Sequence, residues 1–516
     1  MPMPGLKYLS FAVVTALAMP ALADPPAVSP LPMPRPADGA VTVLDVSAPS
    51  RRNVLIEVIA EEAIEVASAD LGLSLTEDEV LADEATAEGG TAAEVEISAL
   101  ASETSPRPVP RADVPADFAE RAALLRAEAE ADEAARRPPR TSDPEFRAWI
   151  AEFEARALAA GISAETFARA FDGLQLNTRV LERDRNQAEF SRALWDYLDT
   201  AVSATRIRNG REALSEWRTT LGRIEAQYQV EAEVVVAVWG LESAYGAMRG
   251  SEGIVEAMAS LAFDGRRQDF FEEQLIAALQ ILEAGDTRAR NMTGSWAGAM
   301  GHTQFMPTSY LEFAQDFDDD GRRNIWSDNP VDALASTAHY LVEHGWVYGQ
   351  PWGMEVRLPE GFDYRLAGEQ ERIGAAFWNA MGVRLVNGDP LPDHGPASIL
   401  LPAGAEGVAL VVHSNFRVIE RYNPADAYVI AIGHLSDRIN GGPGFEAGWP
   451  RGDRALTFAE REELQRLLRA VGHYDERIDG IVGPITIASV RSYQEAIGVT
   501  PDGYASVSIL QRLRDG

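Results

Sequence analysis

Cysteine is absent from the 516 residues of this chain, and lysine occurs once, as Lys7. The lack of cysteine excludes disulfides, thiol nucleophiles and thiolate metal sites. The lack of lysine after Lys7 excludes a P-loop and leaves no amine for Schiff-base chemistry. Basic residues are few altogether, since 46 Lys and Arg stand against 79 Asp and Glu, a formal charge of −33. Phosphate binding needs basic surface, so we expect no nucleic-acid partner.

Two further signatures of hydrolases are missing. The seven histidines form no recognisable zinc set, and no H-E-x-x-H motif occurs. A G-x-S-x-G elbow is absent as well, which disfavours a serine hydrolase. Carboxylates are therefore the remaining candidates for catalytic groups.

The first 23 residues have the pattern of a signal peptide. Lys7 provides a positive charge, residues 9–19 form a short apolar run, and Ala21-Leu22-Ala23 is an A-x-A cleavage site. The apolar run is too short to span a bilayer, and no cysteine follows it to carry a lipid. We expect a soluble protein without a membrane anchor, exported to the periplasm.

Residues 24–142 differ in composition from the remainder of the chain. Proline clusters flank an Ala- and Glu-rich acidic middle that contains almost no aromatic residue. Such a segment cannot bury enough apolar surface to offset its ordering entropy. We predict a disordered acidic tether.

Helical periodicity begins at Ser142 or Asp143, the expected helix cap. Phe146, Trp149 and Phe153 follow at helical spacing and are predicted to lie in the core. The same periodicity continues to about residue 246.

One acidic residue interrupts an apolar helical stretch. Read as a helix, residues 234–246 place Glu242 on one face with Val235, Val238 and Trp239. A carboxyl group among apolar neighbours is expected to have a raised pKa, and a Glu protonated near neutral pH can act as a general acid. A structural Glu, hydrogen-bonded in the core, remains the alternative.

Residues 293–310 are rich in glycine and neutral polar groups. The glycines allow close backbone approach, and Ser295, Gln304 and Tyr310 add uncharged hydrogen-bonding groups. This mixture suits an uncharged polar ligand such as a sugar or an amide. Tryptophans between residues 239 and 352 could stack on sugar faces, although each one singly is better explained as core.

An aspartate-rich segment begins at residue 316. Asp316, Asp318 and Asp320 occupy positions 1, 3 and 5 of an EF-hand-like loop, with Gly321 at position 6. The carbonyl of Arg322 and a later carboxylate, that of Asp328 or Asp332, would complete a calcium site. The usual Glu at position 12 is missing, so a solvated acidic turn is the alternative.

The C-terminal third changes pattern twice. Short strands are predicted at 399–401 and 408–412, and a helix from Asp426. Residues 441–455 are a linker by composition. Residues 456–516 contain enough apolar residues to form the core of a small helical domain, and Asp-Gly turns are predicted at 479–480 and 502–503.

Five ordered motifs between residues 143 and 440 resemble the lytic murein transglycosylase B family. They are Trp-Gly-Leu-Glu-Ser-Ala-Tyr-Gly at 239–246, Gly-Ser-Trp-Ala-Gly-Ala-Met-Gly at 294–301, Gln-Phe-Met-Pro-Thr-Ser at 304–309, the aspartate loop at 316–332, and Asn-Phe-Arg-Val-Ile-Glu-Arg-Tyr-Asn at 415–423. Residues 456–514 resemble the peptidoglycan-binding domain type 1. The resemblance implies a mainly α, lysozyme-like catalytic domain with a small β part, followed by a small helical peptidoglycan-binding domain.

The resemblance also implies an activity. Family members cleave the β-1,4 bond between N-acetylmuramic acid and N-acetylglucosamine and leave 1,6-anhydromuramyl ends, with one catalytic acid that Glu242 matches. The implied substrate-binding residues are Ser295, Gln304, Phe305, Tyr422, Asn423 and Tyr428. The implied metal ligands are Asp316, Asp318, Asp320, Arg322 and Asp332. We expect no cofactor for catalysis, a structural Ca²⁺, peptidoglycan strands as the partner, and a monomer.

The motifs leave two alternatives open. A hydrolytic muramidase on the same fold would differ only in letting water reach the anomeric carbon. A non-catalytic scaffold that binds murein would keep the fold and lose the chemistry. The intact Glu242 and Gln304 disfavour the scaffold.

Overall fold

The computed structural model describes residues 142–516, apart from 186–191 and 369–371. The predicted signal peptide and acidic tether lie outside the described residues. The described chain is mostly helical, as predicted, with two small sheets. No helix in this part of the chain is both long and apolar enough to cross a membrane.

Helices form most of the region from residue 143 to residue 343. Their bounds are α3 Asp143–Ala159, α4 Ala164–Phe171, α5 Thr178–Arg185, α6 Leu194–Ala201, α7 Ala204–Glu216, α8 Arg218–Tyr228, α9 Ala232–Ser243, α10 Ile254–Asp264, α11 Gln268–Ala284, α12 Pro307–Phe313 and α13 Val331–Glu343. Helix α3 begins after Ser142, as expected, although the Ser142 side chain makes no capping hydrogen bond. Phe146, Trp149 and Phe153 are buried, which confirms their prediction as core residues.

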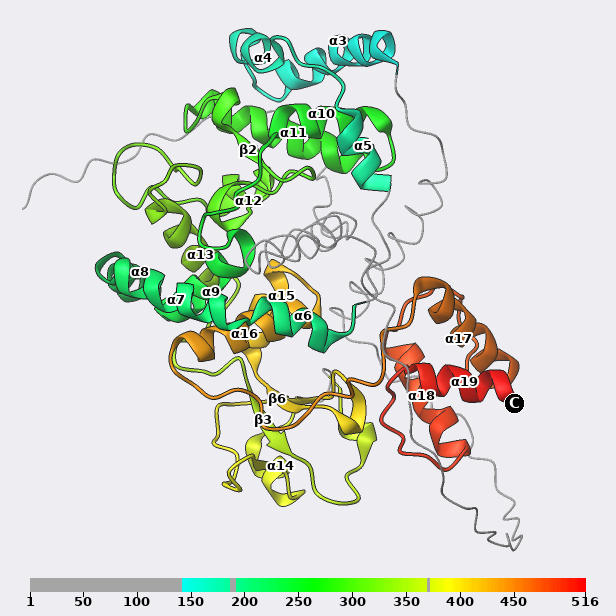
Figure 1. Cartoon of the computed structure of the whole chain (residues 1–516). Helices are drawn as coiled ribbons and strands as arrows, with labels where there is room; N and C mark the ends of the chain where they lie inside the picture. The colour runs from blue at the N-terminus through cyan, green and yellow to red at the C-terminus, as the bar shows by residue number, and fades with distance from the viewer. Residues whose placement is uncertain (1–141, 186–191, 369–371) are drawn as a thin grey trace, which may run out of the picture. The chain divides into compact units, whose positions relative to one another are not determined.

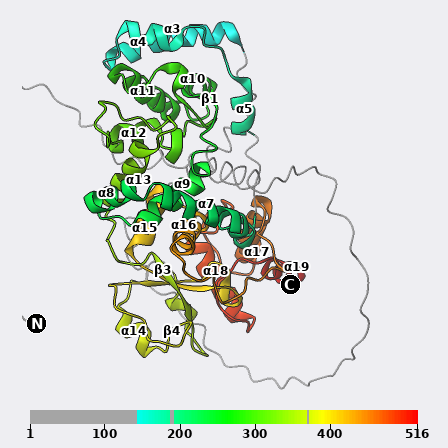
Figure 2. The same ribbon diagram turned by 60° about the vertical axis from the view of Figure 1, so that its left-hand side comes forward.

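Helix α9 lies at the centre of the helical region. It packs against α7, α13 and α16 (Asp426–Ile439), and both views place it among these helices (Figures 1 and 2). Eleven of its twelve residues are buried, so the helix is apolar on all sides and not on one stripe alone. It ends at Ser243, because Ala244 and Tyr245 both adopt left-handed backbone conformations, with φ of 48° and 59°.

The β part follows α13. Four antiparallel strands lie in the order β4-β3-β6-β5, with bounds β3 Gly353–Arg357, β4 Arg384–Leu385, β5 Ser398–Leu400 and β6 Ala409–Val412. Both predicted strands are therefore present, within one residue at their ends. Helix α14 (Ala375–Ala380) packs beside β3 and β4 through the buried Trp378 (Figure 2). The two-residue strands β1 Glu252–Gly253 and β2 Thr293–Gly294 form a separate pair. Helix α15 (Ser414–Tyr422) then leads into α16.

Residues 441–455 contain no helix or strand, but they pack against helices α6 and α16. Phe445 stacks on His434 with ring centroids 4.0 Å apart. Trp449 packs against Trp195, and Arg451 forms an ion pair with Asp199. The glycines and prolines that indicated a linker thus allow an extended path, while the aromatic residues between them hold it in place.

The C-terminal module has three helices and a core of its own. Helices α17 Phe458–Ala470, α18 Pro484–Ala496 and α19 Val507–Asp515 pack around Leu464, Leu468 and Leu510. Thr457 and Glu460 form a capping box at the start of α17.

The two predicted Asp-Gly turns of this module are built alike. Gln465 donates a hydrogen bond to Asp479 (2.7 Å), and its oxygen accepts from the main-chain N–H of Gly480 (2.9 Å). Gln494 makes the same pair of bonds to Asp502 and Gly503, at 2.7 Å each. The module therefore contains an internal structural repeat.

Candidate active site

Glu242 lies in the last turn of α9 and is 2% exposed. The hydroxyl of Tyr428, from α16, donates a hydrogen bond of 2.5 Å to its Oε1. That length is typical of an O–H donor to a carboxylate. The carboxyl group is thus buried, as the sequence predicted, and is held by a hydrogen bond from another helix.

Three buried tyrosines surround the carboxyl group. Burial first, and the negative charge of Glu242 second, raise the pKa values of Tyr197, Tyr422 and Tyr428 above their ordinary value. These phenols therefore stay neutral and can donate protons to hydrogen bonds. They come from α6, α15 and α16, so three separate helices meet at one acid.

An arginine lies close to this group. Arg206 is fully buried and donates to the carbonyl of Thr200 at 2.9 Å. Its positive charge lowers the pKa of Tyr197, in opposition to burial and to Glu242. Neither Tyr197 nor Arg206 was identified from the sequence, because nothing in the local sequence around either residue sets it apart.

Gln304 follows the 3-10 helix η3 (Gly301–Thr303) in a left-handed conformation, with φ of 50°. Its Nε2 donates to the carbonyls of Gly301 (2.8 Å) and Arg249 (3.3 Å). A non-glycine residue in this region costs about 1 kcal/mol, and such residues gather at functional sites. The amide is therefore fixed by its nitrogen, and its oxygen is left for another partner.

Phe305 and Tyr422 form the next part of the wall. Phe305 is 2% exposed, with its ring centroid 5.9 Å from that of Tyr422. The hydroxyl of Tyr422 donates to the carbonyl of Thr303 at 2.5 Å. Tyr422 thus connects α15 to the segment that carries Gln304, and the roles of Phe305 and Tyr422 in substrate binding stay predictions.

Ser295 and Asn423 are both buried, at 1% exposure each. The oxygen of Ser295 accepts from the main-chain N–H of Ala299 at 3.0 Å, which leaves its hydroxyl hydrogen and a second lone pair for a substrate. Asn423 accepts from the N–H of Ala425 at 3.0 Å through Oδ1. Ser295 therefore has a structural bond in addition to its predicted role.

Several buried polar atoms at these residues have no hydrogen-bond partner within the described chain. They are Oη of Tyr197, Oε1 of Gln304 and Nδ2 of Asn423. Buried polar groups are nearly always paired, so each unpaired one requires an explanation. A neutral ligand that offers both donors and acceptors would satisfy them, as a sugar with hydroxyl and acetamido groups does.

The aspartate loop brings three of the predicted metal ligands together. One carboxylate oxygen from each of Asp316, Asp318 and Asp320 lies within 4.8 Å of the others. Asp316 also accepts from the N–H groups of Asp320 (3.1 Å) and Gly321 (2.8 Å), which closes the turn. Gly321 has φ of +86°, the conformation that position 6 of such a loop needs.

Asp332 has a different place from the one predicted. Its two carboxylate oxygens accept from the main-chain N–H groups of Phe317 and Asn324, at 2.8 Å each. Burial raises its pKa to about 6 in spite of these bonds. Through these bonds Asp332 holds the main chain at Phe317 and at Asn324. It is not part of the aspartate cluster. Sequence spacing could not show this, because the direction of the side chain depends on the start of α13.

A cavity of about 430 Å³ lies elsewhere, on α7 and at the end of α16. Arg208, Arg211 and Arg438 line it, and none of the predicted substrate residues does.

Four of the tryptophans between residues 239 and 352 are buried, at 8% exposure or less: Trp239, Trp296, Trp346 and Trp352. This confirms that these four are core residues.

Comparison with known families agrees with this geometry. Residues 145–437, more than half of the chain, match the family described as a transglycosylase SLT domain. Residues 459–513 match the peptidoglycan binding domain family. Both resemblances drawn from the motifs are thereby confirmed.

Individual relatives are similar over different lengths. The membrane-bound lytic murein transglycosylase B of Escherichia coli (strain K12) is 33% identical over 250 residues, which is 47% of this chain and 66% of that protein. The match therefore spans just under two thirds of this curated relative.

Solved structures show the same fold. The crystal structure of SltB3 from Pseudomonas aeruginosa in complex with NAG-anhNAM-pentapeptide is 48% identical, with a TM-score of 0.70, over 72% of this chain and 99% of that chain. The soluble lytic transglycosylase SltB1 from the same organism is 31% identical, with a TM-score of 0.51, over 56% of this chain and 98% of that chain. This chain therefore belongs to the lytic transglycosylase family, with a catalytic domain of the transglycosylase SLT type and a peptidoglycan-binding domain after it.

Proposed function

We propose that this protein cleaves the β-1,4 bond between N-acetylmuramic acid and N-acetylglucosamine in peptidoglycan and leaves a 1,6-anhydromuramyl end. The observation that carries the proposal is the buried Glu242 in the last turn of α9, whose Oε1 is held by a hydrogen bond from the hydroxyl of Tyr428. Glycosidases that activate water or form a glycosyl-enzyme use a second carboxylate at a set distance. A single acid suits a reaction in which the substrate supplies its own nucleophile.

The reaction balances without water. Protonated Glu242 gives its proton to the glycosidic oxygen as the bond from the anomeric carbon to that oxygen breaks. The resulting carboxylate then takes the proton of the muramyl C6 hydroxyl, whose oxygen attacks the anomeric carbon. A nucleophile held within the same sugar has a very high effective molarity, so water need not be activated. Glu242 ends protonated and ready for another cycle.

The surrounding residues have distinct parts in this proposal. Tyr428 holds the carboxyl group through its hydrogen bond to Oε1. The oxygen of Gln304 and the amide nitrogen of Asn423 would bind acetamido and hydroxyl groups, since both are buried without a partner in the described chain. The hydroxyl of Ser295 would add a donor. Phe305 and Tyr422 supply apolar wall.

Hydrolysis by a muramidase mechanism is the rival reaction at the same site. Digestion of purified sacculi followed by mass analysis separates the two, because an anhydromuramyl end is lighter than a reducing end by one water. We expect anhydro ends to predominate. Reducing ends as the main product would establish the muramidase, and the absence of any product would establish the non-catalytic scaffold.

We also propose a structural Ca²⁺ in the aspartate loop. The converging oxygens of Asp316, Asp318 and Asp320 support it, as hard oxygen ligands that Ca²⁺ prefers. The carbonyl of Arg322 stays a predicted ligand. The ion would stabilise the loop and take no part in the reaction.

Three further parts of the proposal concern the setting of the enzyme. Export to the periplasm, through residues 1–23, would place the enzyme beside its polymeric substrate. The C-terminal module would bind the same polymer and hold the catalytic domain near it. We propose that the protein acts as a monomer.

A further inference from the structure

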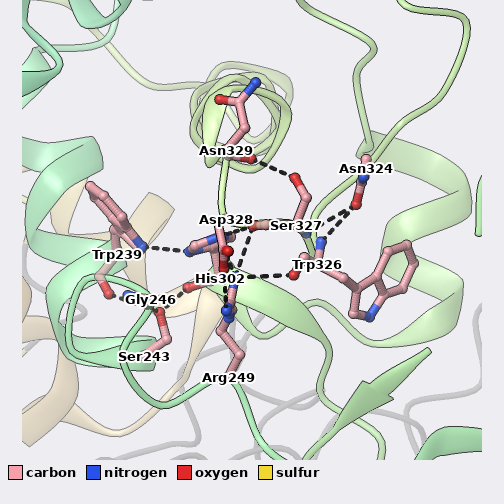
Figure 3. A network of polar contacts seen from close by, with 10 residues as sticks. All are labelled: Trp239, Ser243, Gly246, Arg249, His302, Asn324, Trp326, Ser327, Asp328 and Asn329. Atoms are coloured by element: carbon pink, nitrogen blue, oxygen red, sulfur yellow. Dashed lines mark hydrogen bonds and ion pairs between the residues drawn. The ribbon is translucent and has the colours of Figure 1, made fainter. Parts of the chain in front are cut away.

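The imidazole of His302 joins two segments that are far apart in the sequence. Nε1–H of Trp239 donates to His302 Nδ1 at 3.0 Å, and His302 Nε2 lies 2.7 Å from the carbonyl oxygen of Ser327. In Figure 3 the ring of His302 lies between Trp239 on one side and Ser327 on the other. A carbonyl oxygen can only accept, so Nε2 carries the hydrogen and Nδ1 is the acceptor. The ring is therefore neutral and uses both nitrogens.

The main chain of His302 makes the same connection. Its carbonyl accepts from the hydroxyl of Ser243 at 2.6 Å, and its N–H donates to the carbonyl of Ile325 at 3.0 Å. Ser243 is the residue that follows Glu242, and Trp239 lies one helical turn before Glu242 on the same face. The last turn of α9 is thus attached to His302 on both sides of the acid.

A glycine makes this close approach possible. A Cβ on Gly246 would lie 2.4 Å from Cε1 of the His302 ring, and Gly246 has φ of +85°. A side chain at position 246 would push the ring away from Trp239. The turn after α9 is therefore shaped around the imidazole.

Arg249 makes a second connection between the same parts. Its guanidinium donates to the carbonyls of Trp326 (3.0 Å) and Ser327 (2.8 Å) and pairs with Asp328 at 2.8 Å. Its own carbonyl accepts from Gln304 Nε2. Through His302, residues 324–328 are thus connected to Trp239 and Ser243, which lie on either side of Glu242 in the sequence (Figure 3). Arg249 connects the same segment to Gln304.

We propose that His302 is a positioning residue, which fixes the last turn of α9 against residues 324–328 and so sets where the Glu242 carboxyl lies relative to Gln304. This inference rests on the proposed role of Glu242. His302 acts only in its neutral form with the hydrogen on Nε2. Burial lowers its pKa to about 4, and the charged groups that face it are Arg249 and Asp328.

Two substitutions each remove one of the two side-chain hydrogen bonds of His302, to Trp239 or to Ser327. In His302→Asn, the amide oxygen takes the place of Nδ1 and can accept from Trp239, but the side chain no longer reaches Ser327. In His302→Gln, the amide nitrogen takes the place of Nε2 and can donate to Ser327, but the acceptor for Trp239 is lost. We expect each full-length variant to lose about 10- to 100-fold in kcat on soluble muropeptides, with KM within about twofold, because small displacements of a reacting group have such effects.

The indole N–H resonance of Trp239 provides a readout that turnover cannot give. In protein labelled at the tryptophan indole nitrogen, with Trp239→Phe to assign the signal, His302→Gln is expected to shift this resonance and His302→Asn to leave it near its wild-type position. The double variant Trp239→Phe/His302→Gln should lose no more activity than the single variant with the larger loss, since both substitutions remove the same hydrogen bond. His473→Gln, a half-buried histidine of the C-terminal module, is the matched control and should keep wild-type kcat.

Wild-type kcat in both His302 variants would overturn the inference. Two other results would also overturn the inference, because a purely structural role produces them. In the first, both variants lose activity through equal changes in kcat and KM. In the second, the loss disappears when the activity is scaled to the folded fraction of the protein. Glu242→Gln is measured alongside. If it abolishes turnover while the His302 variants remain active, the proposed function stands and only the positioning role fails. If it remains active, the proposed function fails first.

Discussion

The hydroxyl of Tyr428 donates a 2.5 Å hydrogen bond to Oε1 of Glu242, across 186 positions of sequence. The bond joins the last turn of α9 to the first turn of α16, two helices that pack directly on each other. Burial raises the pKa of Tyr428, so the phenol keeps its own proton and donates it in the hydrogen bond to the carboxyl group. The acid is thus fixed by a donor from the C-terminal part of the catalytic domain.

Glu242→Gln is expected to keep the fold and sugar binding and to lose at least about 100-fold in turnover, because a positioned acid and base contributes that much. Release of anhydromuropeptides from sacculi measures the loss, and binding of the same fragments checks the site. Retention of more than about a tenth of wild-type activity would refute the role of Glu242.

Tyr428→Phe should lower kcat by about tenfold or more. The hydrogen bond to a carboxylate contributes about 1.5–3 kcal/mol, and without it Glu242 is held less firmly. Tyr364→Phe is the control, since this half-buried tyrosine lies in the β part. Equal activity in the two variants would mean that the bond has no part in turnover.

Calcium should raise the melting temperature of the full-length protein. An ion that binds only the native state adds about 2.7 kcal/mol at one hundred times its dissociation constant. Asp318→Ala should abolish the increase and Asp319→Asn should keep it, because both remove one charge from the loop but Asp319 lies outside the cluster. Identical melting curves in EDTA and in excess calcium would show the loop to be an acidic turn only.

Acidification should destabilise the protein through His434, which is 8% exposed and stacks on Phe445. Burial first, and the charge of Arg438 second, lower its pKa to about 4 in the folded state. Between about pH 6.5 and pH 4 the unfolded chain binds a proton that the native chain does not, so stability falls as pH falls. The loss from this group between pH 7 and pH 5 is about 2 kcal/mol.

Unfolding by urea at the two pH values tests the effect of this histidine. His434→Gln should reduce the pH dependence by about that amount relative to wild type. An unchanged pH dependence would mean that His434 titrates normally in the folded protein.

Removal of the C-terminal module should leave the chemistry intact. A chain that ends at Asp453 keeps the packing of Phe445 and Trp449 and removes a module with its own core. We expect unchanged rates on soluble muropeptides and weaker sedimentation with intact sacculi, since a second binding site raises the local concentration of enzyme on the polymer.

The opposite result for this truncation also has a structural basis. Asp502 accepts a 2.9 Å hydrogen bond from the main-chain N–H of Ala405, which lies between β5 and β6. If the shortened chain lost activity on soluble fragments as well, the module would be a structural part of the catalytic domain, and the targeting role would be wrong.

The sequence by itself determined the class of protein, the helices and the acid. An apolar helix interrupted by one Glu requires burial of a carboxyl group, whatever surrounds it, and the ordered motifs identified the family. Short strands and Asp-Gly turns were also predictable, because they depend on neighbouring residues and their backbone preferences.

Only the tertiary structure decided which distant groups gather around Glu242 and the last turn of α9. Tyr197, Arg206 and His302 come from separate elements, and no local pattern distinguishes them from other buried residues. Asp332 shows the same limit within one loop, since its carboxylate turned to main-chain N–H groups that the sequence could not place. Local sequence fixes which residues form a helix, but the packing of helices fixes what each buried polar group touches, and at this site those contacts hold the acid in place.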